Sequence, residues 1–177
     1  MSVELLVIGV IRSGSDVLLV RQPGPDGPGT VWALPGGRTA SGELAVEALA
    51  REVREETGLV IQGMPELVCV GHMVNPTGIR LDDGEIPAPG GSAIVLSYEV
   101  TSFEGSLNCS NDPDAEIAEV AWYSHETAQS LLARHPFPFA RDVARHSLAP
   151  PDGHRPYVAQ SYFRRGTTGA DTALSLD

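Results

Sequence analysis

Three glutamates, Glu52, Glu55 and Glu56, are crowded into the run "REVREETG" of a predicted helix. In isolated helices, like charges at this spacing destabilise the helix by roughly a few tenths of a kcal/mol per pair. Hard divalent cations such as Mg²⁺ and Mn²⁺ bind carboxylate oxygens, and a bound cation offsets that repulsion. The cluster therefore predicts either a cation site or a solvated acidic surface held by salt bridges.

The helix that carries these glutamates is predicted over residues 42–57, with Ser41 as N-cap, Glu43 in the first turn and Gly58 at the end. At about 100° per residue, one face is apolar and should be buried. That face consists of Ala45, Val46, Leu49 and Val53. The opposite face, expected in solvent, carries Arg54 and a favourable i,i+4 pair, Glu47 and Arg51.

The glutamates do not lie on the solvent face. Glu52 and Glu56 project roughly 60° and 20° from Leu49, and Glu55 lies at the margin of the apolar stripe. A carboxylate directed toward a core must be paired, bound to a metal or protonated. This position makes the cation site as strong an interpretation as the acidic surface.

The elements around the helix alternate in type along the chain. A second helix is predicted over 125–135, and the long Pro- and Gly-rich segment 75–91 is predicted to be a functional loop. Strands are predicted at 3–11, 16–22, 66–74, 92–100 and 116–124, and 31–37 is predicted to be a short strand that ends in a Pro-Gly-Gly turn. Only one connection resembles a parallel crossover, so the order favours an α+β fold with a mixed β-sheet and helices packed against it.

Length and charge limit the function further. A chain of 177 residues suits one domain, placed at 1–149, followed by a tail at 150–177 that is partly disordered or docked on a partner subunit. A net charge of −11 disfavours nucleic-acid polymers and anionic membranes as partners. The N-terminus lacks a basic leader, and two cysteines, Cys69 and Cys109, cannot form a disulfide framework. We therefore expect a cytoplasmic protein.

The residues around the helix resemble a known signature. From Gly37 the chain reads "GRTASGELAVEALAREVREETGL", which is similar to the Nudix box of the Nudix hydrolases, and "WALPGG" precedes it. The matching positions are Gly37, Glu43, Arg51, Glu52, Val53, Glu55, Glu56, Gly58 and Leu59. No position of the box departs from the pattern, and the resemblance extends over about residues 3–135.

This resemblance implies a Nudix fold, a mixed β-sheet sandwiched between helices, and metal-dependent hydrolysis of a diphosphate linkage in a nucleoside diphosphate derivative. It implies that Glu52, Glu56 and Glu55 hold Mg²⁺ or Mn²⁺, with the carbonyl of Gly36 as a further ligand. Arg51 and Glu43 would support these ligands. The general base would be a box glutamate or a distant carboxylate, for which the candidates are Glu85, Glu116 and Glu119.

Several points stay open at the level of sequence. Trp32 is more typical of a core residue than of a base-stacking one. Charge alone suggests three phosphate contacts, namely Arg21, Arg38 and Arg80. The substrate could be a nucleoside triphosphate, ADP-ribose, a nucleotide sugar or a dinucleoside polyphosphate, and a homodimer is compatible with the sequence. The alternative function is a non-catalytic Nudix-like nucleotide sensor, although such modules typically lose the box glutamates that this chain retains.

Overall fold

The computed structural model describes residues 3–24, 29–74, 92–110, 112–113, 116–149, 159–165 and 171–173. The predicted loop 75–91, with Glu85 and Arg80, lies outside the described residues. The helices are α1 (Ala45–Thr57), α2 (His125–Leu132) and α3 (Pro138–Leu148). The strands are β1 (Val3–Ser13), β2 (Asp16–Pro23), β3 (Thr30–Ala33), β4 (Gly36–Arg38), β5 (Leu59–Ile61), β6 (Glu66–Val74), β7 (Ser92–Val100), β8 (Phe103–Gly105), β9 (Glu119–Ser124), β10 (Ala159–Arg165) and β11 (Asp171–Ala173).

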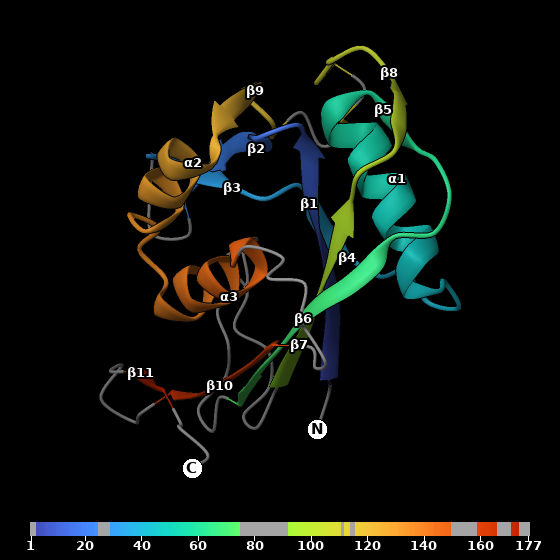
Figure 1. Cartoon of the computed structure of the whole chain (residues 1–177). Helices are drawn as coiled ribbons and strands as arrows, with labels where there is room; N and C mark the ends of the chain where they lie inside the picture. The colour runs from blue at the N-terminus through green and yellow to red at the C-terminus, as the bar shows by residue number, and fades with distance from the viewer. Residues whose placement is uncertain are drawn as a thin grey trace.

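The main sheet is mixed, as the sequence predicted. Its strand order is β11-β10-β6-β7-β1-β2-β3, with β4 also paired to β1 and β9 also paired to β2. The pairs β1–β7 and β6–β10 are parallel, and the other pairs are antiparallel. A separate two-stranded sheet joins β5 to β8. In Figure 1 the long strands β1, β6 and β7 cross the centre of the molecule between α1 and the pair α2 and α3.

Alternating side chains of the central strands supply a core to each face. Val7 and Ile11 of β1 pack with Leu49 and Val53 of α1. On the opposite face, Val10 packs with residues from α2 and α3, namely Ala128, Leu132, Ala144 and Leu148. The sheet is therefore sandwiched between helices, and α1 is fixed by its apolar stripe.

The start of α1 differs from the prediction. The N-cap is Leu44 rather than Ser41, with φ −72° and ψ 150°, and its N–H donates to Glu47 Oε2 at 2.8 Å. Glu43 therefore precedes the helix instead of lying in its first turn. Its carboxylate accepts from the N–H of Ala40 at 2.8 Å and also contacts Arg51 of α1.

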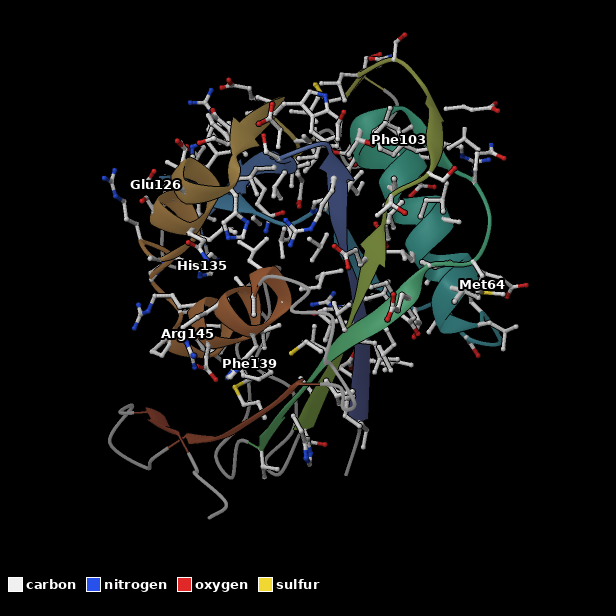
Figure 2. All side chains as sticks on the ribbon, viewed as in Figure 1. Met64, Phe103, Glu126, His135, Phe139 and Arg145 are labelled. Atoms are coloured by element: carbon white, nitrogen blue, oxygen red, sulfur yellow. The ribbon has the colours of Figure 1, made fainter. Side chains whose placement is uncertain are left out.

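Two other elements were predicted incompletely. The short strand predicted in 31–37 is β3, but the expected Pro-Gly-Gly turn leads into a second strand, β4, and the carbonyl of Pro35 accepts from the N–H of Gly9 at 2.8 Å. Helix α3 was not predicted. Its first residue is Pro138, which a helix tolerates at that position because the N–H there has no intrahelical acceptor. Phe139, labelled in Figure 2, and Val143 bury its inner face against β6, where Gly71 leaves room for them.

Part of the segment expected to be a tail contributes to the sheet. Residues 159–165 form β10, which pairs in parallel with β6 from Ala159 opposite Cys69 to Arg164 opposite Val74. β11 pairs with β10 in turn. No helix among the described residues has both the length and the apolar character that a bilayer span requires.

Candidate active site at the carboxylate cluster

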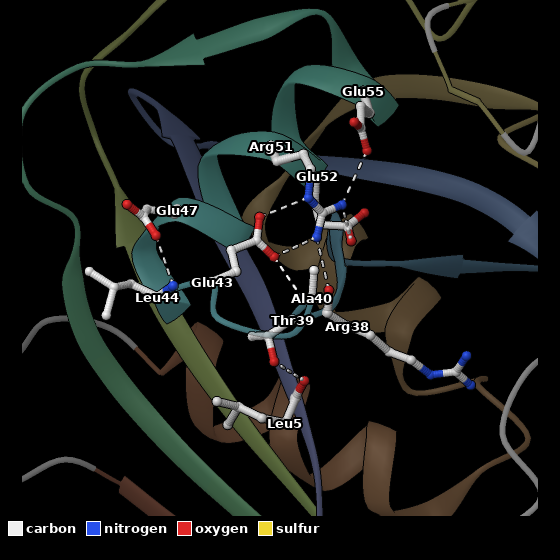
Figure 3. Close-up of polar contacts among 10 residues, drawn as sticks. All are labelled: Leu5, Arg38, Thr39, Ala40, Glu43, Leu44, Glu47, Arg51, Glu52 and Glu55. Carbon is white, nitrogen blue, oxygen red and sulfur yellow. Dashed lines mark hydrogen bonds and ion pairs between the residues drawn. The ribbon is translucent and has the colours of Figure 1, made fainter.

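Arg51 is the centre of the charged cluster on α1 (Figure 3). Its Nε donates to Glu43 Oε1 at 2.9 Å and its Nη2 donates to Glu43 Oε2 at 3.0 Å. Its Nη1 donates to Glu52 Oε1 at 2.7 Å and to Glu55 Oε2 at 3.2 Å. The side chain is only 30% exposed. The helical arithmetic placed Arg51 in solvent beside Glu47, and that prediction is wrong. Three carboxylates hold the guanidinium against the loop that precedes α1.

The same guanidinium also fixes the main chain that leads into the helix. Arg51 Nη2 donates to the carbonyl of Arg38 at 2.9 Å. Hydrogen bonds from Arg51 and from the N–H of Ala40 lower the pKa of Glu43 to about 2. Hydrogen bonds to Glu43 raise the pKa of Arg51 in return, although burial opposes that rise. Glu43 and Arg51 are therefore both charged at neutral pH, and their pair is a permanent ionic support for the loop before the helix.

Glu56 is held in a different way. It is buried, with 8% of its surface exposed, and its Oε2 accepts from the N–H of Gly36 at 2.8 Å. Burial raises the pKa of Glu56 to about 8; the Gly36 hydrogen bond opposes this rise, and the charges of Glu52, Asp112 and Glu55 add to it. Burial also raises the pKa of Glu52, against the contacts with Arg51. Burial thus disfavours the charged forms of Glu52 and Glu56, two carboxylates in the last turns of α1.

Two glycines of β4 let this strand approach α1 on one side and β1 on the other. A Cβ on Gly37 would lie 2.6 Å from the carboxyl carbon of Glu52. A Cβ on Gly36, where φ is +147°, would lie 2.1 Å from the carbonyl oxygen of Val7. Because neither residue has a side chain, Gly37 leaves room for the Glu52 carboxylate and Gly36 packs directly on the backbone of β1.

The predicted site residues are thus neighbours, although they do not form a closed cage. Among the residues that the structure describes, no three His, Cys, Asp or Glu side chains are close enough together to hold a metal ion. Glu52 and Glu55 share the Nη1 group of Arg51, whereas Glu56 is bound to Gly36. The predicted ligands are therefore held by two separate partners, the guanidinium of Arg51 and the backbone of Gly36.

The other predicted candidates lie in varied surroundings. Arg21 Nη2 lies 3.1 Å from Glu119 Oε2, and its guanidinium is 5.8 Å from the ring centre of Trp32. Trp32 is partly buried and meets Tyr123 edge-on, with the ring centres 5.0 Å apart. The side chain of Arg38 extends away from the carboxylates in Figure 3. Arg21 is therefore engaged by neighbouring strands.

One acidic residue near Glu56 was not singled out from the sequence. Asp112 acts on the pKa of Glu56 through its charge, and its Oδ2 accepts from the N–H groups of Glu116 at 2.6 Å and Ile117 at 2.9 Å. The signal available was its place in the acidic segment before β9, where Glu116 and Glu119 were considered instead. Only the folded chain shows which of these acids acts on Glu56.

Comparison with known proteins places this arrangement in a family. The model of the NUDIX domain matches residues 3–144. An 8-oxo-dGDP phosphatase of Homo sapiens is 33% identical over 131 residues, which is 73% of this chain and 35% of that protein. An ADP-ribose pyrophosphatase of Methanocaldococcus jannaschii is 41% identical over 54 residues, 30% of this chain and 31% of that protein. The chain spans about a third of the length of these curated relatives.

Solved structures agree with the fold. A MutT protein of Bacillus halodurans has a TM-score of 0.64 at 21% identity, covering 97% of this chain and 95% of that one. A NUDIX hydrolase of Nitrosomonas europaea has a TM-score of 0.56 at 25% identity, covering 82% of this chain and 88% of that one. These likenesses confirm the predicted mixed sheet between helices.

Proposed function

Because the chain belongs to the Nudix family, we propose that it is a divalent-metal-dependent hydrolase that cleaves the diphosphate linkage of a nucleoside diphosphate derivative. Glu52, Glu55 and Glu56 would hold Mg²⁺ or Mn²⁺, with the carbonyl of Gly36 as a further ligand. Arg51 would position these carboxylates. The complete match to the Nudix box, residues 37–59, supports this assignment.

The observation that carries the proposal is the environment of Glu56. A carboxylate with 8% of its surface exposed has only one hydrogen bond within the described part of the chain, from Gly36. The negative charges of Glu52, Glu55 and Asp112 act on it as well, and its pKa is raised to about 8. Such a group is costly for folding alone. Oxygen donors and excess negative charge are what a hard divalent cation requires, so the carboxylate donors of these residues fit the metal by their chemistry.

The residues around the proposed cation would each have a definite role. Arg51 donates to both Glu52 and Glu55 through Nη1. Its two hydrogen bonds to Glu43, from Nε and Nη2, fix the orientation of the guanidinium. The N–H of Gly36 holds one oxygen of Glu56. When bound, the cation would neutralise the diphosphate and lower the pKa of a bound water. The ions would also let a protein of net charge −11 accept an anionic substrate.

We assign removal of the proton from water to a box glutamate rather than to Glu119. Glu119 forms a 3.1 Å ion pair with Arg21, which lowers its availability as a base. Asp112 would add negative charge beside Glu56 and strengthen its attraction for the cation.

The names of the relatives suggest which substrates to test first. An 8-oxo-dGDP phosphatase matches the greater share of the chain, and an ADP-ribose pyrophosphatase matches a shorter segment. We therefore propose an oxidised nucleoside diphosphate as the first substrate and ADP-ribose as the second. We place the activity in the cytoplasm, consistent with the absence of a disulfide between the buried Cys69 and the partly buried Cys109.

A phosphate-release screen tests the proposal. The purified protein is incubated with 8-oxo-dGDP, 8-oxo-dGTP, ADP-ribose or nucleotide sugars and with Mg²⁺ or Mn²⁺. Phosphate is measured directly for the diphosphate, after inorganic pyrophosphatase for the triphosphate, and after a phosphomonoesterase for ADP-ribose and the nucleotide sugars. Glu56→Gln should lower turnover by orders of magnitude while the fold is retained. Glu47→Gln is the matched control, because Glu47 is exposed on the same helix and, within the described part of the chain, its carboxylate accepts only from the N–H of Leu44.

Each outcome has a clear meaning. Hydrolysis that is lost in Glu56→Gln and kept in Glu47→Gln supports the proposal and names the substrate class. A Glu56→Gln variant as active as the wild type contradicts the metal site. Tight binding of a diphosphate without turnover by any cation would favour the sensor function instead, and thermal-shift measurements with each ligand detect that binding.

A further inference from the structure

The segment Ser106–Ser110, which follows β8, lies directly against the end of α1. The N–H of Asn108 donates to the carbonyl of Thr57, the last residue of α1, at 2.8 Å. Gly58 follows with φ +76°, and a Cβ there would lie 2.7 Å from the carbonyl oxygen of Ser106 and 3.0 Å from Cβ of Asn108. The contact thus begins one residue after Glu56.

The side chain of Asn108 shapes this segment. Its Oδ1 accepts from the N–H of Ser110 at 2.9 Å and from the hydroxyl of Ser110 at 2.7 Å. Asn is favoured in such turns because its side-chain oxygen accepts from the backbone N–H two residues later and so takes the place of a backbone carbonyl. The side chain is exposed and does not contribute to the apolar core. Its hydrogen bonds therefore shape the turn without burying surface.

The turn is anchored on both sides. Before it, Phe103 of β8 stacks on Trp122 of β9, with ring centres 5.6 Å apart, and Figure 2 labels Phe103 beside α1. After it, the N–H of Asp112 donates to the carbonyl of Cys109 at 3.4 Å. Asp112 is the acid whose charge acts on Glu56. The turn thus joins the end of α1 to the neighbouring carboxylate.

We propose that Asn108 is a positioning residue for the carboxylate site, because its side-chain oxygen folds the turn that binds the last carbonyl of α1 and so sets the place of Glu56. The inference rests on the proposed function, since it concerns the same metal site. It adds a residue outside the box, 52 positions after Glu56 in sequence. Its expected effect is on metal affinity and turnover rather than on substrate binding.

The experiment measures binding of Mn²⁺ alone, by titration calorimetry and by the electron paramagnetic resonance of free Mn²⁺. Asn108→Ala should raise the Kd for Mn²⁺ roughly tenfold, the lower end of the effect seen for residues that support metal ligands. Asn108→Ser should restore part of the affinity, because serine forms the same turn more weakly. Kinetics with the substrate found above should show a lower kcat with KM unchanged.

One control and one graded variant separate positioning from general destabilisation. Ser15→Ala removes another exposed turn hydrogen bond, from Ser15 Oγ to Asp16 Oδ1 at 3.3 Å, and should leave Mn²⁺ affinity unchanged. Ser110→Ala removes only the hydroxyl contact with Asn108 and should raise the Kd in the same direction by a smaller factor. The Tm of each variant shows whether the fold is retained.

The outcomes separate this inference from the proposed function. An Asn108→Ala variant with wild-type Mn²⁺ affinity overturns it, whatever the Tm, and so does an Asn108→Ser variant no better than Asn108→Ala. If the wild type binds Mn²⁺ but hydrolyses no diphosphate, the proposed function fails while the comparison of affinities still decides the role of Asn108. A wild type that does not bind Mn²⁺ overturns both.

Discussion

Arg51 and Glu43 form a two-bond fork between α1 and the loop that precedes it, with Nε to Oε1 at 2.9 Å and Nη2 to Oε2 at 3.0 Å. Planar guanidinium and carboxylate groups match each other in this geometry, which fixes orientation as well as distance. The remaining nitrogen, Nη1, is thereby directed at Glu52 and Glu55. A residue outside the helix thus orients the carboxylates within it.

Arg51→Lys should therefore impair the site although it keeps the charge. An ammonium group is a point charge and cannot bind Glu43 through two bonds while it also reaches Glu52. We expect kcat to fall about 10- to 100-fold, the range seen for residues that support metal ligands. Steady-state kinetics and Mn²⁺ titration measure the effect. Arg54→Lys, at an exposed position of the same helix, is the control, and equal activity of the two variants would contradict the role of the fork.

Gly37 and Gly36 should respond differently to the same substitution. In Gly37→Ala the new Cβ meets the far end of a flexible side chain, the Glu52 carboxylate, at 2.6 Å. The carboxylate can move, so stability should change little while metal affinity and turnover fall. In Gly36→Ala the new Cβ meets the backbone of Val7 and Ile8 at 2.1 Å and 2.7 Å, at a φ of +147° that only glycine tolerates well.

Thermal unfolding and Mn²⁺ titration compare the two glycine variants. Gly36→Ala should cost at least about 2 kcal/mol, the range of a strained backbone residue. That corresponds to a fall in Tm of roughly 4–8 °C for a chain of this size. Gly37→Ala should stay within about 2 °C of the wild type, equivalent to less than 1 kcal/mol. The interpretation fails if Gly37→Ala loses stability in proportion to its activity.

The sequence predicted the fold because hydrophobic periodicity determines where strands and helices lie. The strands at 66–74 and 92–100 were predicted with the bounds that the structure has, and α1 and α2 were predicted with their ends shifted by a few residues. Helix α3 was missed, because no helix was predicted beyond residue 135. The structure shows that Pro138 begins the helix. Local signals thus identified the central elements and failed at a helix that depends on packing against Gly71 and β6.

The site was predictable only as a set of residues. Spacing on the helix and the resemblance both indicated Glu52, Glu55 and Glu56, and the structure brings them near one another. The contact of Arg51 with Glu43 and the charge of Asp112 on Glu56 depend on how the loops before and after α1 fold onto it. Helical arithmetic places a side chain on a face, but a long side chain such as that of Arg51 can bend toward carboxylates beside the helix.

The metal-free protein should lose stability as pH rises through the neutral range. The pKa of Glu56 is raised from an ordinary 4.5 to about 8 in the folded state. Between these values the folded chain holds a proton that the unfolded chain releases, so folding stability falls with rising pH. The contribution is complete below about pH 4.5 and is lost as pH rises through about 8. The raised pKa of Glu52 acts in the same direction.

Other groups do not obscure this trend. The pKa of Glu43 is lowered to about 2, so its contribution is present above about pH 4.5 and is lost only as pH falls toward 2. Burial lowers the pKa of His146, which makes stability rise with pH near its ordinary value of 6.5. The difference between the wild type and Glu56→Gln isolates the effect of Glu56, because His146 is common to both.

Thermal melts of EDTA-treated protein from pH 5.5 to 8.5 measure the slope. The Tm of the wild type should fall relative to that of Glu56→Gln, which has no proton to release at this position, and Glu47→Gln should follow the wild type. Saturating Mn²⁺ should raise the Tm of the wild type most at the upper end of the range, because a cation competes with the proton for the carboxylate. Parallel curves for the wild type and Glu56→Gln would show that Glu56 is not a buried group that titrates in this range.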